Sequence, residues 1–163
     1  MAEFSTSSVL QAYDGALYAA PYGTALPDDI ATALDAAFVV QGWITEDGLT
    51  FSPNLDAPDA IKGWPRGETL LQPAATLSPE FGFTLAQHDS DALDWIVDPS
   101  REMSLVLEYR ATAGSALHRL VLAKAKITDA GEMAFNTEDL IGVEITVGCS
   151  VGDDGFTFAF LIP

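Results

Sequence analysis

Over the last third of the chain, apolar residues recur at every second position, and this pattern limits the region to β-strands. In the run REMSLVLEYR, Met103, Leu105 and Leu107 alternate with Glu102, Ser104, Val106 and Glu108. This period of two is typical of a strand that is buried on one face. Similar runs follow over residues 117–126, 140–151 and 156–162, separated by turn-forming clusters that include Ala113-Gly114 and Asp153-Asp154-Gly155. Strands joined by tight turns pair antiparallel.

The first hundred residues predict shorter elements. We expect strands over residues 15–19, 38–44, 49–52 and 81–85, with Glu46-Asp47-Gly48 as the turn between the second and the third. Residues 28–37 predict one or two helical turns, and residues 89–97 a short helix whose Leu93, Ile96 and Val97 face inward. The sequence therefore predicts a mainly β fold, an antiparallel β-sandwich or barrel-like sheet with one short helix, in a single domain over residues 1–163.

A long stretch without any period interrupts this pattern. After Phe51 three prolines, at 53, 58 and 65, lie among scattered polar and apolar residues. A compact domain rarely keeps such a segment unless it has a function. We therefore expect a docking arm for a neighbouring copy over about residues 42–66. Its expected contact residues are Trp43, Ile44, Asp47, Gly48, Leu49, Phe51, Leu55, Ile61 and Trp64.

Charge limits the partners. The net charge is -17, and the first basic residue is Lys62. Proteins that bind nucleic acid present stripes of lysine and arginine, which this chain lacks. The acidic balance indicates either solubility or a surface that must lie near DNA without binding it.

Candidate catalytic and metal-binding residues are few. His88 and His118 are the only histidines, and neither lies in a recognisable catalytic motif. The single cysteine, Cys149, lies in a strand-like run and is expected to be a buried, inert thiol. Asp89, Asp91 and Asp94 have the wrong spacing for a calcium loop and are interpreted as helix-capping residues. We expect no enzyme activity, no metal and no cofactor.

Two other functions stay open. Trp43, Trp64 and Trp95, together with Tyr13, Tyr18 and Tyr22, could form a carbohydrate-stacking platform on an acidic β-sandwich. The third hypothesis is a hydrolase with an acid pair, although 24 acidic residues make such pairs inevitable. A carbohydrate-binding module would be a stable monomer that binds sugar saturably.

Several segments, read together, resemble the major tail proteins of long-tailed phages, especially phages of actinobacteria. These are GALYAAPYGTALP (15–27), GWITEDGLT (42–50), Trp64 near the end of the long loop, and the alternating strand with its short helix over residues 80–96. The resemblance covers about residues 12–110 and extends to the rest through its β character. It implies hexameric rings that stack into a hollow tube, with inner strands of six copies joined in one β-barrel and DNA passing through without specific binding.

The resemblance also implies partners and a location. The expected partners are other copies of the chain, the tail tip or initiator and tail terminator proteins, and a tape measure protein in the lumen. The expected location is the virion tail, assembled in the host cytoplasm. From the residues given we expect no signal peptide, no membrane anchor and no extra C-terminal immunoglobulin-like domain. Glu102 and Glu108, which share a predicted strand face, are the candidates for lining the lumen.

Overall fold

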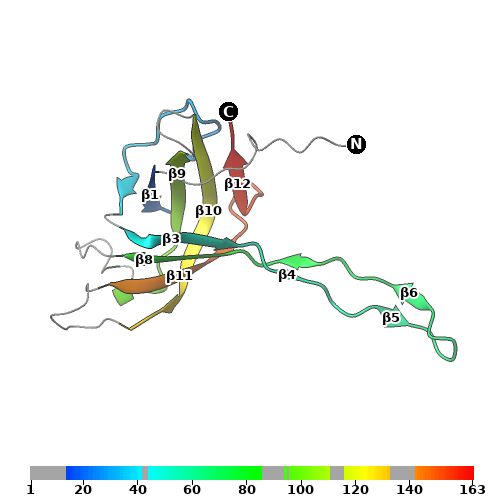
Figure 1. The fold of residues 1–163 in the computed structure, drawn as a ribbon. Coiled ribbons are helices and arrows are strands. Elements are labelled where there is room, and N and C mark those ends of the chain that lie inside the picture. The colour runs from blue at the N-terminus through cyan, green and yellow to red at the C-terminus, as the bar shows by residue number, and fades with distance from the viewer. Residues whose placement is uncertain (1–13, 42–43, 86–93, 95, 111–115, 133–141) are drawn as a thin grey trace, which may run out of the picture.

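The computed structural model describes residues 14–41, 44–85, 94, 96–110, 116–132 and 142–163, and gives backbone but not side-chain surroundings for residues 44–48. Within these residues the regular secondary structure is almost entirely antiparallel strand (Figure 1). The strands are β1 (Asp14–Pro21), β2 (Val39–Val40), β3 (Ile44–Ser52), β4 (Leu55–Asp56), β5 (Ile61–Lys62), β6 (Thr69–Leu71), β7 (Thr76–Leu77), β8 (Glu80–Leu85), β9 (Met103–Arg110), β10 (Leu117–Ala130), β11 (Val143–Ser150) and β12 (Phe158–Leu161). The predicted mainly β, antiparallel fold is confirmed.

The long strand β10 organises the body of the molecule. Strand β9 pairs with one edge of β10, and β1 and β2 continue the sheet on that side. Along the opposite edge, β12 pairs with Arg119–Leu122, and β11 then pairs with Lys124–Ala130. Strands β8 and β3 extend the sheet beyond β11. Strand β10 therefore belongs to both halves of one eight-stranded sheet. One half continues through β9, β1 and β2, and the other through β12, β11, β8 and β3.

The two halves of this sheet enclose the main core. Its buried side chains come from β1, β9 and β10 in one half and from β8 and β11 in the other. At its margin, Phe51 of β3 packs against Phe158 of β12, with ring centroids 4.9 Å apart. The alternation of β8 has its predicted effect, because Phe81, Phe83 and Leu85 are all buried. The other buried members of this cluster are Leu17, Ala19, Met103, Leu105, Leu120, Leu122, Ala125, Ile127, Val143, Ile145 and Val147.

A second, smaller cluster covers the opposite face of β9 and β10. Val106 and Val121 are fully buried there under Phe38, with Leu26 and Leu34 packed at the margin. The segment between β1 and β2 therefore lies over the sheet as a cover. This explains why both faces of β9 and β10 are buried, which a simple alternation does not predict.

The predicted helical turns over residues 28–37 are wrong. The segment forms bends and turns, and the Asp29 carboxylate accepts hydrogen bonds from the backbone N–H of Ala31 (2.8 Å) and Thr32 (2.6 Å). Arg119 of β10 holds it in place, because its guanidinium donates to the carbonyls of Asp29 (2.9 Å) and Thr32 (2.6 Å). Contacts with the sheet thus override the weak helical preference of a short segment.

The predicted hairpin turn at Glu46-Asp47-Gly48 is also wrong. Residues 44–52 form one strand, β3, whose register against β8 shifts between Ile44 and Leu49. Three more residues lie on β3 than on β8 across this shift, so the Asp-Gly pair falls in a bulge instead of reversing the chain.

The predicted short helix is present in part. Asp94, Ile96 and Val97 are helical, and the N–H of Asp98 donates to the carbonyl of Asp94 (3.0 Å). Ile96 packs against the main core, but Val97 is 81% exposed, so its predicted inward position is wrong. Leu93 and the acids at 89 and 91 lie outside the described residues.

Candidate interaction surface

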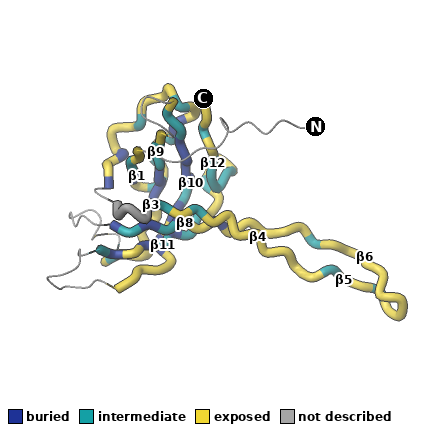
Figure 2. Tube along the Cα trace, viewed as in Figure 1, coloured by how far each residue is buried: buried dark blue, intermediate teal, exposed yellow. Residues whose placement is uncertain are grey.

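An arm over residues 53–79 projects from the body between β3 and β8 (Figures 1 and 2). Strand β4 pairs with β7 near its root, and β5 pairs with β6 near its tip. The N–H of Ser78 donates to the carbonyl of Asn54 (2.9 Å) and closes the root, and the N–H of Gly63 donates to the carbonyl of Glu68 (2.8 Å) at the tip. The arm is therefore an extended antiparallel hairpin, not an irregular loop.

This arm exposes large apolar side chains along its length. Trp64 at the tip is 95% exposed, and Leu55 and Leu70 are each about 70% exposed. Figure 2 shows most of the arm in the colour of exposed residues. The register sets Leu55 opposite Leu77 and Ile61 opposite Leu71, so apolar residues form cross-strand pairs. An isolated two-stranded hairpin is at best marginally stable in water. Such a feature is typical of a surface that another protein covers.

The structure divides the predicted docking residues between the arm and the body. Leu55, Ile61 and Trp64 lie on the arm. Leu49 and Phe51 belong to β3 and pack against the main core. The backbone of Ile44, Asp47 and Gly48 lies in β3, while Trp43 lies outside the described residues.

Sequence reasoning missed the return leg of the arm. Leu70, Leu71 and Leu77 are also exposed, at 69%, 56% and 42%, but they lie beyond the predicted end of the segment at residue 66. A signal was available: Gly63 and Gly67 flank the tip, and Leu71 and Leu77 follow it at about the distances at which Ile61 and Leu55 precede it. The corrected arm is therefore residues 53–79.

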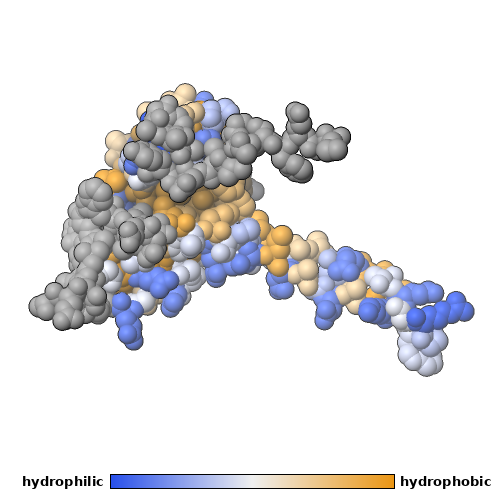
Figure 3. Space-filling model, in the orientation of Figure 1, coloured by the Kyte–Doolittle hydropathy of each residue, from blue (hydrophilic) through white to orange (hydrophobic). Residues whose placement is uncertain are grey.

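An aromatic cluster lies at the root of the arm. Phe160 of β12 is 51% exposed, and its ring centroid is 5.8 Å from those of Phe51 and Phe158. Beside the root, an open cavity of about 520 Å³ is lined by Leu77, Pro79 and Cys149 among others. Together these residues extend the apolar surface from the arm onto the body (Figure 3).

Strand edges of the body are open as well. In the described part of the chain, β2 and β3 each end a sheet path and β12 pairs with β10 alone. Unpaired edges with exposed residues such as Val39 and Val40 can accept a strand from another chain.

The two candidate lumen residues differ in their surroundings. Glu102 is 42% exposed and forms an ion pair of 3.0 Å with Lys124. Glu108 is only 18% exposed, and its carboxylate is bound by the buried guanidinium of Arg119 at 2.7 Å. The cover segment lies over this second pair through its bonds to Arg119. Glu108 is therefore engaged in an ion pair within the chain, and that both glutamates line the lumen stays a prediction.

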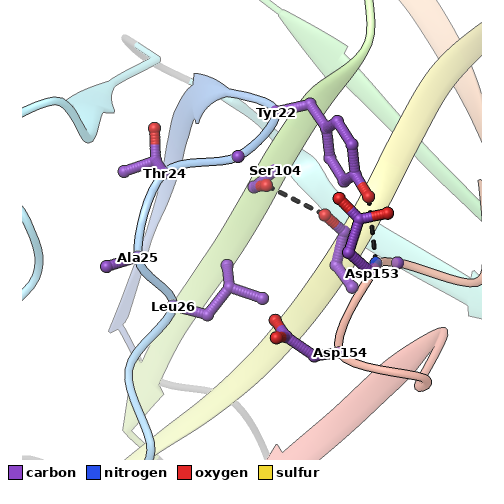
Figure 4. Close-up of a pocket in the computed structure, with 10 residues that line it drawn as sticks. Tyr22, Thr24, Ala25, Leu26, Ser104, Asp153 and Asp154 are labelled. Atoms are coloured by element: carbon purple, nitrogen blue, oxygen red, sulfur yellow. Dashed lines mark hydrogen bonds between the residues drawn. The ribbon is translucent and has the colours of Figure 1, made fainter.

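A small polar cavity of about 280 Å³ lies where β1 ends, beside the β11–β12 turn (Figure 4). The N–H of Asp153 donates to the Tyr22 hydroxyl (3.0 Å), and Lys124 Nζ lies 4.7 Å from the centroid of the Tyr22 ring. Burial, followed by the hydrogen bond with Asp153, raises the pKa of Tyr22. Ser104 donates to the carbonyl of Ala123 (2.9 Å), so its hydroxyl is engaged. These polar groups of the cavity form hydrogen bonds or ring contacts within the protein, and no nucleophile–base pair lies among them.

The other residues considered for chemistry are separated. His118 stacks on Tyr109 with ring centroids 5.2 Å apart, and its buried Nδ1 has no hydrogen-bond partner. Burial raises the pKa of the Cys149 thiol to about 12. No group of residues that could hold a metal occurs among the described residues. In the same residues, no helix has the length and apolarity needed to cross a bilayer.

The described aromatic residues do not form a carbohydrate platform. Trp64 lies at the tip of the arm, whereas Tyr18 packs in the second core cluster and Tyr22 lines the polar cavity. Trp43, Trp95, Tyr13 and His88 lie outside the described residues.

Comparisons with known proteins add a fold-level likeness. No family model matches the chain, and no curated protein matches it. Among solved structures, a crystal structure of an Hcp protein is similar with a TM-score of 0.40 and 10% sequence identity, over 90% of this chain and 96% of that one.

Proposed function

We propose that this chain is a self-assembling structural subunit, and specifically the tail tube subunit of a long-tailed phage. The observation that carries the proposal is the arm, an extended hairpin whose apolar residues are exposed in the single chain. Burying one large apolar side chain against a neighbouring copy contributes about 2 kcal/mol. Burial of the six exposed large apolar side chains of the arm would therefore strongly favour association. The open edges of β2, β3 and β12 offer further places for contact between copies.

In this proposal the arm reaches a neighbouring copy. Residues 55–64 span roughly 30 Å at ~3.3 Å per residue, enough to pass beyond the subunit's own body. Contacts between one patch and a different patch of the next copy are heterologous, and they generate rings or open filaments. Stacked rings, hexameric in the family that the sequence resembles, would form the tube.

The acidic composition supports a conduit for DNA. A basic lumen would hold phosphates, whereas an acidic one lets the polyanion pass. Glu102 and Glu108 are the proposed lumen residues, and Glu102 is the more exposed of the two, at 42% against 18% of its side chain. The proposed partners are the tail tip or initiator, the tail terminator and a tape measure protein, and the proposed location is the virion tail after assembly in the host cytoplasm. We propose no enzyme activity.

Replacing the arm with a tight turn tests this function. Because Ser78 N donates to Asn54 O across the root, residues 55–77 can be exchanged for Asn-Gly, which favours a two-residue hairpin turn. We expect a folded variant with wild-type β-sheet circular dichroism that stays monomeric in sedimentation velocity at concentrations where the wild type assembles. Normal rings or tubes from this variant would contradict the proposal that the arm drives assembly.

A further inference from the structure

The tip of the arm differs in charge from the rest of the molecule. Residues 53–79 hold three acids and two of the seven bases, so the remaining residues carry 21 acids and five bases, a net charge of -16. At the tip, residues 61–68 contain Lys62, Arg66 and a single acid, Glu68. The far end of the arm is correspondingly hydrophilic in Figure 3. The chain therefore presents a small cationic tip on a strongly anionic body.

The two cations of the tip are unpaired within the described part of the chain. Lys62 and Arg66 are exposed and form no ion pair or hydrogen bond there with their side chains. Two bases of the body are paired, since Arg119 binds Glu108 and Lys124 binds Glu102. The tip also carries Trp64, which is 95% exposed. Two free cations beside one exposed aromatic ring make a contact surface that combines charge with apolar area.

We infer that the tip formed by Lys62, Trp64 and Arg66 docks on the acidic body of a second copy, so that charge selects the arm's partner. This inference rests on the proposed self-assembly. Charge complementarity argues for it, because the tip is positive and the body of every other copy is strongly negative. Attraction between exposed charges accelerates encounter and fixes which surfaces meet, and Trp64 then supplies apolar contact.

Nucleic acid, the other polyanion, fits the tip less well. Two cations with an acid nearby offer few phosphate contacts, and the anionic body repels a second polyanion. A protein surface also accommodates the apolar side chain of Leu70, which is 69% exposed beside the tip.

The test reverses the charge of the tip in the full chain. We compare Lys62→Glu/Arg66→Glu with the charge-conserving control Lys62→Arg/Arg66→Lys, and follow assembly by light scattering at low and high salt. Both variants should keep the wild-type melting temperature, because the two side chains have no partners in the described residues. The reversed variant should assemble at least about tenfold more slowly at low salt, and the difference should vanish near 1 M salt, where the Debye length is ~3 Å. The control should match the wild type.

Several results would overturn the inference. Assembly of the reversed variant at the wild-type rate in low salt would contradict it, as would a salt-independent difference. Binding of labelled DNA that depends on Lys62 and Arg66, measured by fluorescence anisotropy, would assign the tip to nucleic acid instead. The arm replacement run in parallel separates the two proposals: if it fails to assemble while the reversed variant assembles normally, self-assembly through the arm stands and charge selection fails.

Discussion

Removing the carboxylate of Glu108 should destabilise the fold, because Glu108 neutralises a buried cation. Arg119 is 6% exposed in its side chain, and both its Nε (2.8 Å) and its Nη2 (2.7 Å) contact the same oxygen, Glu108 Oε1. In Glu108→Ala, the hydrogen bonds left to the guanidinium in the described part of the chain are those to the Asp29 and Thr32 carbonyls. A buried charge left without its counter-ion costs about 3–5 kcal/mol.

The low end of this range is expected, since the carboxylate of Glu108 is 18% exposed and water can reach the site. A loss of about 3 kcal/mol corresponds to a fall of roughly 6–12 °C in melting temperature for a domain of this size. Glu102→Ala is the matched control, because its pair with Lys124 is far more exposed and should contribute little. Urea unfolding followed by circular dichroism measures both free energies.

A double-mutant cycle with Arg119→Met isolates the pair. The double variant should lose less free energy of unfolding than the sum of the single losses, because removing both charges leaves no buried ion unpaired. A loss below about 1 kcal/mol in Glu108→Ala, or strict additivity in the cycle, would refute the reasoning.

Two further predictions concern ionisable groups. With its pKa raised to about 12 by burial, the Cys149 thiol should react with iodoacetamide at pH 8 about a thousandfold more slowly in the folded protein than in urea; equal rates would contradict the buried, inert thiol. The pKa of Asp29 is lowered mainly by the Thr32 hydroxyl bond, so Thr32→Val should raise it toward the ordinary 3.8, as NMR titration would show. The pKa of Asp29 is lower in the folded than in the unfolded protein. The stability that the ionised Asp29 contributes is therefore present above the unfolded pKa and is lost as the pH falls through the folded pKa. Asp29→Asn should weaken the acid dependence of the free energy of unfolding below about pH 4, and an unchanged dependence would contradict the assignment.

Local alternation predicted the strands well, and contacts distant in sequence decided the rest. Phe81, Phe83 and Leu85 are buried as predicted because the strand period of two is a property of the chain itself. Residues 28–37 and the Asp47-Gly48 pair were wrongly assigned because bonds to Arg119 and pairing with β8 decide their conformation.

For the candidate site, the sequence indicated an unusual segment but misplaced its end. Leu55, Ile61 and Trp64 were identified from the absence of any period after Phe51. Leu71 and Leu77 were missed because their role depends on pairing with Ile61 and Leu55 across the hairpin. The low exposure of Glu108 could not be predicted from the sequence either. The alternation along its strand is that of a strand with one exposed face, but the segment between β1 and β2 covers that face.

Negative-stain electron microscopy of the concentrated wild-type protein tests self-assembly most directly. The exposed arm and open strand edges predict rings or hollow tubes that become more frequent with concentration. Small single particles at every concentration, unchanged when preformed tail tips are added as initiators, would contradict the account.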